Sequence, residues 1–210
     1  MSKQRPVYLD YSASTPTDPR VVEAMIPYFT DVFGNASSAH SFGRKAEDAI
    51  ENARRTVAKY LNCKPSEIVF TSGGSESDNL AIRGAAWTAQ HQNAANHLLT
   101  TPIEHSAVSN TMVQLADYMG FDLTYIPVNR QGVVTPQAFQ DAITDKTSIA
   151  SIMYVNNEVG TVQPLAELGA IAKAHGILFH TDAVQAAGQL SLDVQALNVD
   201  LLSISGHKFY

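Results

Sequence analysis

The sequence predicts an α/β fold, a three-layer α-β-α arrangement in which helices cover both faces of a mostly parallel sheet. Strand-like and helix-like segments alternate at least five times along the 210 residues, the pattern of parallel strands joined by crossover helices. Two strand-like runs, 148–155 and 177–180, are apolar without alternation, as expected for strands buried on both faces. The sequence contains no internal repeat, low-complexity tract or linker.

The composition is that of a globular domain and excludes several classes of protein. Apolar residues make up 45% and charged residues 16%, so much of the chain is expected to be buried or to face a partner. A net charge of −6 without a basic run disfavours nucleic-acid and anionic-membrane partners. No apolar stretch has the length of a membrane span, and the N-terminus lacks a signal-peptide core, so we expect a cytoplasmic protein.

The N-terminal part is predicted to be mainly helical. After a short apolar run at 7–10, Asp18 followed by Pro19 is typical of a helix start. A longer helix is predicted over 44–61, where apolar residues recur at spacings of three and four. A turn is predicted at 62–65.

The remaining chain alternates between the two kinds of element. Strands are predicted at 67–71, 97–101, 121–128, 148–155, 176–182 and 200–205. Helices are predicted at 75–88, 106–119, 136–143 and 164–175. Because ligands bind beyond the carboxyl ends of the strands in such sheets, the residues just after each strand are the candidates for function.

An anion cradle is predicted after the strand at 67–71, in the segment SGGSESDN. Gly73 and Gly74 permit a tight turn, and the helix from Ser75 offers free N–H groups that suit a phosphate. The pattern is neither GxGxxG nor a Walker motif, which disfavours dinucleotides and nucleoside triphosphates. An ordinary turn with a serine cap is the alternative.

Three other polar residues follow strands, and each also has a structural explanation. His105 is either an aromatic or acid–base group or a helix cap. Asn156, next to Asn157, can donate hydrogen bonds to an anionic or carbonyl oxygen, but both are also common turn residues. Burying the Asp182 carboxylate costs free energy unless it is paired, and a cationic heterocycle nitrogen would supply that pairing. The alternative is that Asp182 caps a helix.

Lys208 follows the last predicted strand in the segment SISGHKFY. A lysine desolvated at such a place has a lowered pKa and can form a Schiff base, whereas a solvated loop lysine is the default alternative. A phosphate cradle, a strand-end Asp and a strand-end Lys are together what pyridoxal 5′-phosphate (PLP) requires. The combination is more specific than any of its parts.

Seven segments also resemble a known family. They are YLDYSASTPTDPRV, FGNASSAHSFGRKAEDAIENAR, EIVFTSGGSESDNLAI, EHSAV, VNNEVGTVQP, HTDAVQAAG and SISGHKFY. Together they resemble cysteine desulfurases of the NifS/IscS type, within the class V aminotransferase-like, fold-type I PLP enzymes. The resemblance implies an N-terminal segment at 1–20 and a PLP-binding large domain at 21–210, incomplete at its C-terminus and without the small domain.

The resemblance also implies roles for individual residues. Lys208 is implied to form the Schiff base and to move the proton at the substrate carbon, and Asp182 to pair with the pyridinium nitrogen. His105 is implied to stack over the ring and to assist proton movement. The other implied contacts are Gln185 to the phenolic oxygen, Gly74, Ser75, Ser205 and His207 to the phosphate, and Asn156 beside the ring and the substrate carboxylate. The roles of Gln185 and Asn156 rest on the resemblance alone.

The implied activity converts L-cysteine to L-alanine and delivers the sulfur as a protein persulfide for iron–sulfur cluster assembly or related sulfur transfer. The implied partners are L-cysteine, a second copy in a homodimer, and an iron–sulfur scaffold or other sulfur-acceptor protein. The alternatives are another class V PLP enzyme, such as an aminotransferase or selenocysteine lyase, and a non-catalytic fragment. Release of sulfide, rather than transfer of an amino group, distinguishes the first reading from an aminotransferase.

The family's persulfide-forming cysteine has no counterpart among these residues. Cys63 is the single cysteine, which excludes an internal disulfide or a cysteine metal cluster, and no metal site is predicted. It lies in a turn with only Lys64 nearby to favour a thiolate, so we expect a structural thiol. Family members are about twice as long, so the chain is expected to be an N-terminal fragment, poorly soluble and inactive by itself.

Overall fold

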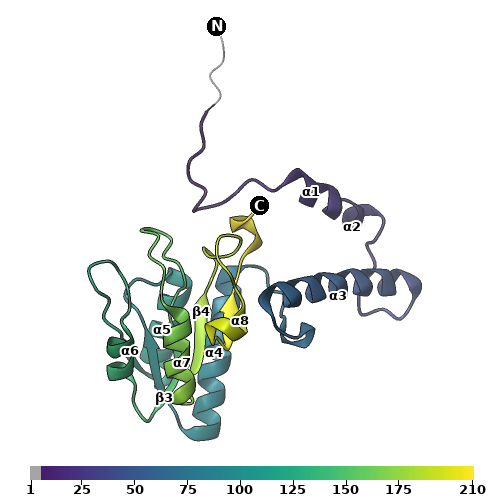
Figure 1. Cartoon of the computed structure of the whole chain (residues 1–210). Helices are drawn as coiled ribbons and strands as arrows, with labels where there is room; N and C mark the ends of the chain where they lie inside the picture. Colours follow the sequence, from purple (N-terminus) through teal and green to yellow (C-terminus); the bar gives the residue numbers. More distant parts are fainter. Residues whose placement is uncertain (1–5) are drawn as a thin grey trace. The chain divides into compact units, whose positions relative to one another are not determined.

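The computed structural model describes residues 6–210, which form two compact units. The N-terminal unit takes the chain up to Ala53 together with Gly206–Tyr210, and the core unit is Arg54–Ser205. Figure 1 shows the course of the chain through both, coloured along the sequence. The predicted division into 1–20 and 21–210 stays a prediction.

The N-terminal unit is helical, and α1 (Pro19–Met25) begins as predicted. The carboxylate of Asp18 accepts a hydrogen bond from the Arg20 N–H at 2.8 Å, with Pro19 in the first helical position. The helix α2 (Pro27–Thr30) follows, and α3 (Ser41–Leu61) begins three residues before the predicted start and continues into the core unit. The one-turn helix η2 (Gly206–Lys208) belongs to the N-terminal unit.

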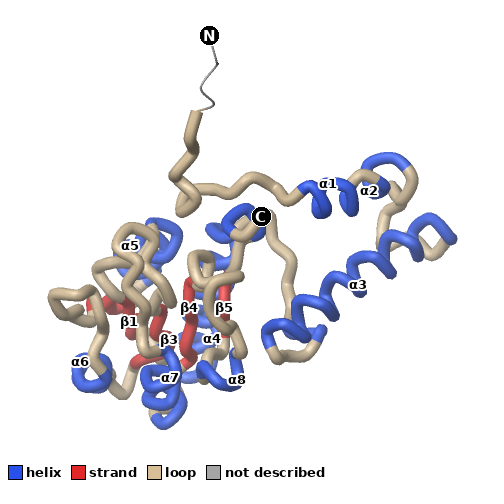
Figure 2. Tube along the Cα trace, turned by 45° about the horizontal axis from the view of Figure 1, so that its top comes forward, coloured by secondary structure: helices blue, strands red, loops and turns tan. Residues whose placement is uncertain are grey.

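A five-stranded parallel sheet forms the centre of the core unit. Its strands are β1 (His97–Thr100), β2 (Asp122–Tyr125), β3 (Thr147–Ser151), β4 (Leu178–Asp182) and β5 (Leu201–Ser203). Their order is β2-β1-β3-β4-β5, and every neighbouring pair is parallel. Figure 2 shows the strands in red, lying side by side between the helices. The predicted mostly parallel sheet is therefore confirmed.

Helices cover both faces of this sheet, because successive strand residues point to opposite faces. Leu98 of β1 packs in one core with residues of α4 (Gly74–Asn93) and α5 (Ser106–Met119), including Ile82 and Met112. Leu99 packs in a second core, with α6 (Pro136–Ala142) and α7 (Leu165–Ala174). The short α8 (Val194–Leu197) leads to β5. The three-layer prediction is confirmed.

The predicted strand at 67–71 is wrong. The structure has a one-turn helix, η1 (Pro65–Glu67), followed by a loop in which Val69 is 66% exposed and Phe70 50% exposed. An extended segment becomes a strand only by hydrogen bonding to a neighbour, and no strand of the described residues pairs with this one. The side chain of Arg54 instead lies over the Phe70 ring, 5.0 Å from its centroid.

The other five predicted strands are all longer than the observed ones, and two of them show the reason. The predictions 121–128 and 148–155 correspond to Asp122–Tyr125 and Thr147–Ser151. Their apolar runs continue because Ile126, Ile152 and Met153 are buried without being part of the sheet. Hydrophobicity therefore overestimates the length of these strands.

None of the described helices is long and apolar enough to cross a membrane. Within residues 6–210 there is also no group of three or more His, Cys, Asp or Glu side chains placed to hold a metal ion. Independently of these findings, ligands in parallel sheets of this kind bind beyond the carboxyl ends of the strands, so that edge is the place to look for a site.

Candidate cofactor site

One edge of the sheet gathers the predicted residues of the core unit. Since all five strands are parallel, their carboxyl ends open onto the same edge. His105 follows β1, Asn156 follows β3, Asp182 ends β4 and Ser205 follows β5.

At the start of α4, where the sequence predicts an anion cradle, the backbone closely approaches neighbouring side chains. The helix begins at Gly74, and a Cβ atom there would lie 3.2 Å from Val184 Cγ2 and 3.5 Å from Ser205 Cβ. Gly74 therefore lies beside residues that follow both β4 and β5. Ser75 is exposed at the first turn of this helix. The free N–H groups of a 20-residue helix start here, next to the ends of two strands.

Asp182 is buried at the carboxyl end of β4, with 6% of its surface exposed. Its Oδ1 accepts a hydrogen bond from the Val184 N–H at 2.9 Å. The residues after it form turns rather than the helix that the capping alternative requires. Gln185 is half-buried in that turn segment, three positions after Asp182.

His105 caps α5. Its Nδ1 accepts a hydrogen bond from the Ala107 N–H at 3.2 Å, which assigns any proton of the neutral ring to Nε2. The side chain is exposed, so capping leaves the ring accessible at the sheet edge.

Asn156 is buried and already hydrogen-bonded within the protein. Its Nδ2 donates to the Ile103 carbonyl at 2.9 Å, and its Oδ1 accepts from the Glu158 and Val159 N–H groups at 3.0 and 2.9 Å. These bonds tie the end of β3 to the segment after β1. These hydrogen bonds agree with the alternative that Asn156 is a turn residue, because they account for its amide group.

Lys208 and His207 belong to the N-terminal unit. Lys208 Nζ donates to the carbonyl of Ser12, and the His207 carbonyl accepts from the Thr15 N–H and hydroxyl at 2.8 and 3.0 Å. Lys208 is half-buried. The segment that carries the lysine is therefore hydrogen-bonded to residues near the start of the chain, and it follows Ser205 directly in the sequence.

Sequence reasoning missed three titratable residues near Asp182 whose charged groups are buried. They are Asp78 in the first turns of α4, His180 on β4, and Glu104 just before His105, which is half-buried as a residue but has a buried carboxyl oxygen. The spacing of His180 and Asp182, two residues apart on one strand and so on the same face, could have indicated His180. Asp78 and Glu104 are distant from Asp182 in the sequence, and only the fold brings them near it.

Burial shifts the pKa values of these groups. It raises the pKa of Glu104 to about 8 and, with a smaller contribution from the Asp182 charge, that of Asp78 to about 7. It lowers the pKa of His180 to about 3, so this imidazole is neutral at neutral pH. Asp78 Oδ1 and Glu104 Oε2 are buried and accept no hydrogen bond from the described residues.

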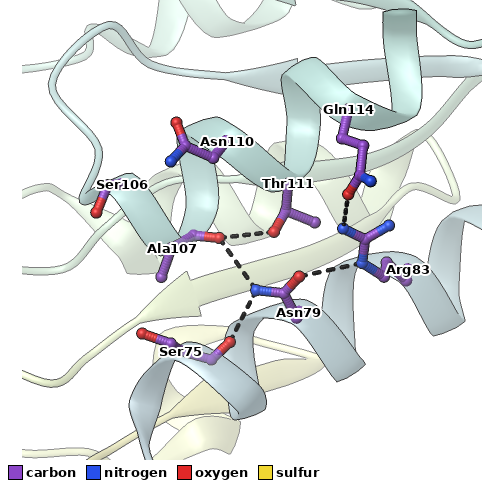
Figure 3. A pocket seen from close by; sticks show the side chains of 8 residues that line it. All are labelled: Ser75, Asn79, Arg83, Ser106, Ala107, Asn110, Thr111 and Gln114. Atoms are coloured by element: carbon purple, nitrogen blue, oxygen red, sulfur yellow. Dashed lines mark hydrogen bonds between the residues drawn. The ribbon is translucent and has the colours of Figure 1, made fainter. Parts of the chain in front are cut away.

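A pocket of about 310 Å³ lies between α4 and α5. Asn79 is one of the lining residues drawn in Figure 3. Its Nδ2 donates to the Ser75 carbonyl at 2.9 Å and to the Ala107 carbonyl at 3.5 Å. Arg83 contacts both Asn79 Oδ1 and Gln114 Oε1. These hydrogen bonds join α4, which begins at the cradle, to α5, which His105 caps.

The residues at this edge fit PLP. Glycine at position 74 lets the start of α4 approach Val184 and Ser205 closely, where a Cβ would lie 3.2 Å from Val184 Cγ2, and it leaves the first N–H groups of the helix unshielded by a side chain, as a phosphate requires. The buried carboxyl groups of Asp78, Glu104 and Asp182, two of them with an oxygen that no described residue satisfies, favour a bound cation such as a protonated pyridine nitrogen.

Cys63 is a poor candidate for a nucleophile. It is half-buried after α3, and burial, with a smaller contribution from Glu67, raises the pKa of its thiol. A raised pKa lowers the thiolate fraction at neutral pH. This environment agrees with the predicted structural role.

Solved structures with this fold are similar to the chain over nearly its whole length. One described as SspA in complex with cysteine superposes with a TM-score of 0.91 at 46% identity, covering 96% of this chain and 57% of that one. A NifS-like protein superposes with a TM-score of 0.92 at 41% identity, covering 97% and 55%.

Curated relatives are similar at the level of sequence. The cysteine desulfurase IscS of Clostridium botulinum (strain Hall) is 50% identical over 210 residues, which is 100% of this chain and 52% of the relative. The cysteine desulfurase IscS of Methylococcus capsulatus is 52% identical over 206 residues, covering 98% and 50%. The chain spans about half the length of these relatives. The family model described as aminotransferase class-V matches residues 7–210, and the chain therefore belongs to the class-V aminotransferase family.

Proposed function

We propose that the protein is a PLP-dependent cysteine desulfurase whose cofactor site is the carboxyl edge of the core sheet. The observation that carries the proposal is a glycine cradle beside a buried carboxyl group. The cradle is at Gly74, which begins α4 and lies next to Ser205 after β5, and the carboxyl group is that of Asp182 at the end of the neighbouring strand β4. The similarity to relatives named cysteine desulfurase supports the substrate class.

In this proposal the chain's residues bind and orient. Gly74, Ser75, Ser205 and His207 hold the phosphate, and Asp182 keeps a ring nitrogen protonated. Gln185 hydrogen-bonds the phenolic oxygen, and Asn156 lies beside the ring and the substrate carboxylate. His105 lies over the ring, and Lys208 holds the cofactor covalently and moves the proton at the substrate carbon. When bound, the cofactor supplies an electron sink at the substrate's α-carbon.

The remaining partners are part of the same proposal. The sulfur of L-cysteine passes to a thiol other than Cys63, whose burial disfavours the thiolate, and then to an iron–sulfur scaffold or another acceptor protein. We also propose that the protein is a cytoplasmic homodimer. The inactivity of residues 1–210 alone stays a prediction.

The test is a product assay on the complete gene product, meaning these residues with any that the gene encodes beyond them. With PLP, L-cysteine and a thiol reductant, we expect alanine and sulfide in equal amounts. Transfer of the amino group to a keto acid without sulfide release would contradict the desulfurase assignment and leave the PLP assignment intact.

Gly74→Ala is expected to weaken PLP binding about 3- to 10-fold, equivalent to roughly 1 kcal/mol. The added Cβ would lie 3.2 Å from Val184 Cγ2, inside the cradle. The matched control is Gly84→Ala on the same helix, where a Cβ meets nothing within 4 Å. Equilibrium titration with PLP measures both variants, and equal affinities would rule out the cradle as the phosphate site.

A further inference from the structure

Two pairs of small residues bring the start of α4 close to the end of β5, and the second pair has no role in the site described above. Gly74 and Ser77 are three residues apart and therefore lie on one face of α4. A Cβ at Gly74 would lie 3.5 Å from Ser205 Cβ, and Ser77 Oγ lies 2.8 Å from Ser203 Oγ. The helix therefore meets the strand end at two successive points, and the second of them is a hydrogen bond.

Two further buried groups extend the Ser77–Ser203 hydrogen bond into the sheet. Ser203 Oγ also lies 3.3 Å from Nε2 of His180 on β4, and His180 Nδ1 lies 2.8 Å from Oγ of Ser151 on β3. Ser203, His180 and Ser151 are fully buried. A hydroxyl group donates one hydrogen bond and accepts two, so Ser203 can bond both of its neighbours at once. These hydrogen bonds anchor α4 to three adjacent strands.

Ser77 lies in the first turn of α4, at the end of the helix that carries the cradle. Its backbone N–H donates to the Gly73 carbonyl at 3.1 Å, which closes this turn. The N–H groups that precede Ser77 in the helix are the ones that a phosphate would use. One residue therefore fixes the first turn within the helix, through its backbone, and against β5, through its side chain.

The rest of α4 is held to the sheet in a less directional way. Ile82, Ala85 and Ala86 pack in an apolar core with Leu98 and Ile149, and apolar burial has no preferred direction. A hydrogen bond between two hydroxyl groups, in contrast, weakens outside a narrow range of about 2.5 to 3.0 Å. The hydroxyl contact is therefore the interaction suited to define how far the first turn lies from the end of β5.

We propose that Ser77 and Ser203 are positioning residues of the cofactor site. Their hydrogen bond fixes the distance between the start of α4 and the end of β5, and in this way it sets the affinity of the cradle for a phosphate group. The inference rests on the proposed function for the source of that group, which is PLP. A purely structural role, in which the hydrogen bond only stabilises the fold, predicts a lower thermal stability without a selective loss of phosphate binding.

The experiment compares PLP with pyridoxal, which lacks the phosphate, in equilibrium titrations of the complete gene product. Ser77→Ala removes the hydroxyl group on the half-buried side of the contact and leaves a good helix former in α4. We expect it to weaken PLP binding about 3- to 10-fold, on the scale of one hydrogen bond, and pyridoxal binding by less than about 2-fold. A ratio of the two affinities equal to that of the wild type would overturn the inference.

Ser148→Ala is the matched control. Ser148 is buried near the amino end of β3, at the opposite edge of the sheet, and its Oγ donates to the His97 carbonyl at 3.0 Å. This variant also loses one side-chain hydrogen bond, so its melting temperature should fall while its ratio of PLP to pyridoxal affinity stays that of the wild type. Equal falls of the ratio in Ser77→Ala and Ser148→Ala would indicate general destabilisation and overturn the inference.

A double variant tests whether the two hydroxyl groups act through one contact. Ser203→Ala should lower the affinity ratio at least as much as Ser77→Ala, since Ser203 also contacts His180. Adding Ser77→Ala to Ser203→Ala should lower the ratio no further, because substitutions at the two ends of a single contact are not additive. Fully additive losses would contradict the shared contact. If Ser203→Ala does not fold, Ser77→Ala and its control decide the inference.

A failure of the proposed function gives a different result. A protein that binds neither PLP nor pyridoxal contradicts the proposed function, and titration with inorganic phosphate, followed by phosphorus NMR, then decides the inference. Weaker phosphate binding in Ser77→Ala than in Ser148→Ala would support it, and equal or absent binding would overturn it. A protein that binds PLP and pyridoxal with the same affinity ratio in Ser77→Ala as in the wild type contradicts only the inference.

Discussion

Replacing Lys208 with alanine is expected to abolish covalent attachment of PLP and to lower desulfurase turnover by at least about a thousandfold, on the scale of removing a covalent catalyst. A lysine amine is the group that can form a Schiff base with the cofactor's aldehyde, and alanine offers no replacement. The segment around Lys208 is hydrogen-bonded through its backbone to Thr15. The local backbone should therefore survive the substitution.

The measurement is borohydride reduction of the loaded complete gene product, followed by peptide mass mapping. We expect the adduct on the peptide that contains Lys208 and none in Lys208→Ala. Lys173→Ala is the control, since Lys173 is an exposed residue in the last turn of α7. An adduct on another lysine of the wild-type protein would show that the assignment of Lys208 is wrong.

Asp182→Asn is expected to reduce turnover by about a hundredfold or more, on the scale of removing one preorganised charged group. Asparagine keeps the shape and still accepts the hydrogen bond from the Val184 N–H. It loses the charge that holds a ring nitrogen protonated through a charge-assisted hydrogen bond. The effect should therefore appear in turnover and in the absorbance of bound PLP, with little change in thermal stability.

Asp193→Asn is the matched control for this prediction. The Asp193 carboxylate accepts hydrogen bonds from the Gln195 and Ala196 N–H groups and from Asn62 Nδ2, all at 3.0 Å, so its role is structural: it caps α8 and ties it to the residue after α3. If Asp182 were only such a cap, the two variants would behave alike. Full turnover in Asp182→Asn would remove Asp182 from the catalytic site.

The order of the elements could be predicted because it depends on local patterns. The helix at Ser106–Met119 has the predicted bounds, and α1 starts at the predicted cap because Asp18 and Pro19 act within one turn. The strand ends were less accurate. Apolar residues such as Ile152 continue into buried loops, and periodicity does not distinguish burial in a loop from burial in a strand.

The candidate site could be predicted only in part. Gly74, Asp182 and Lys208 stand out because their chemistry is unusual for their place after a strand or a turn. Asn156 shows the limit of that reasoning. Its amide group is hydrogen-bonded to the backbone of Ile103, Glu158 and Val159, and no spacing in the sequence indicates these contacts.

The sequence by itself determined the alternation of strands and helices, the parallel sheet that follows from it, and the residue types at the strand ends. These are consequences of local periodicity, turn chemistry and connection rules. The tertiary structure alone decided two other matters. It left residues 68–71 as a loop, since a strand needs a hydrogen-bonded neighbour, and it placed Asp78 beside His180 and near Asp182. Burial and the pKa shifts that follow are set by groups distant in sequence, so they exist only once α4 packs on the sheet.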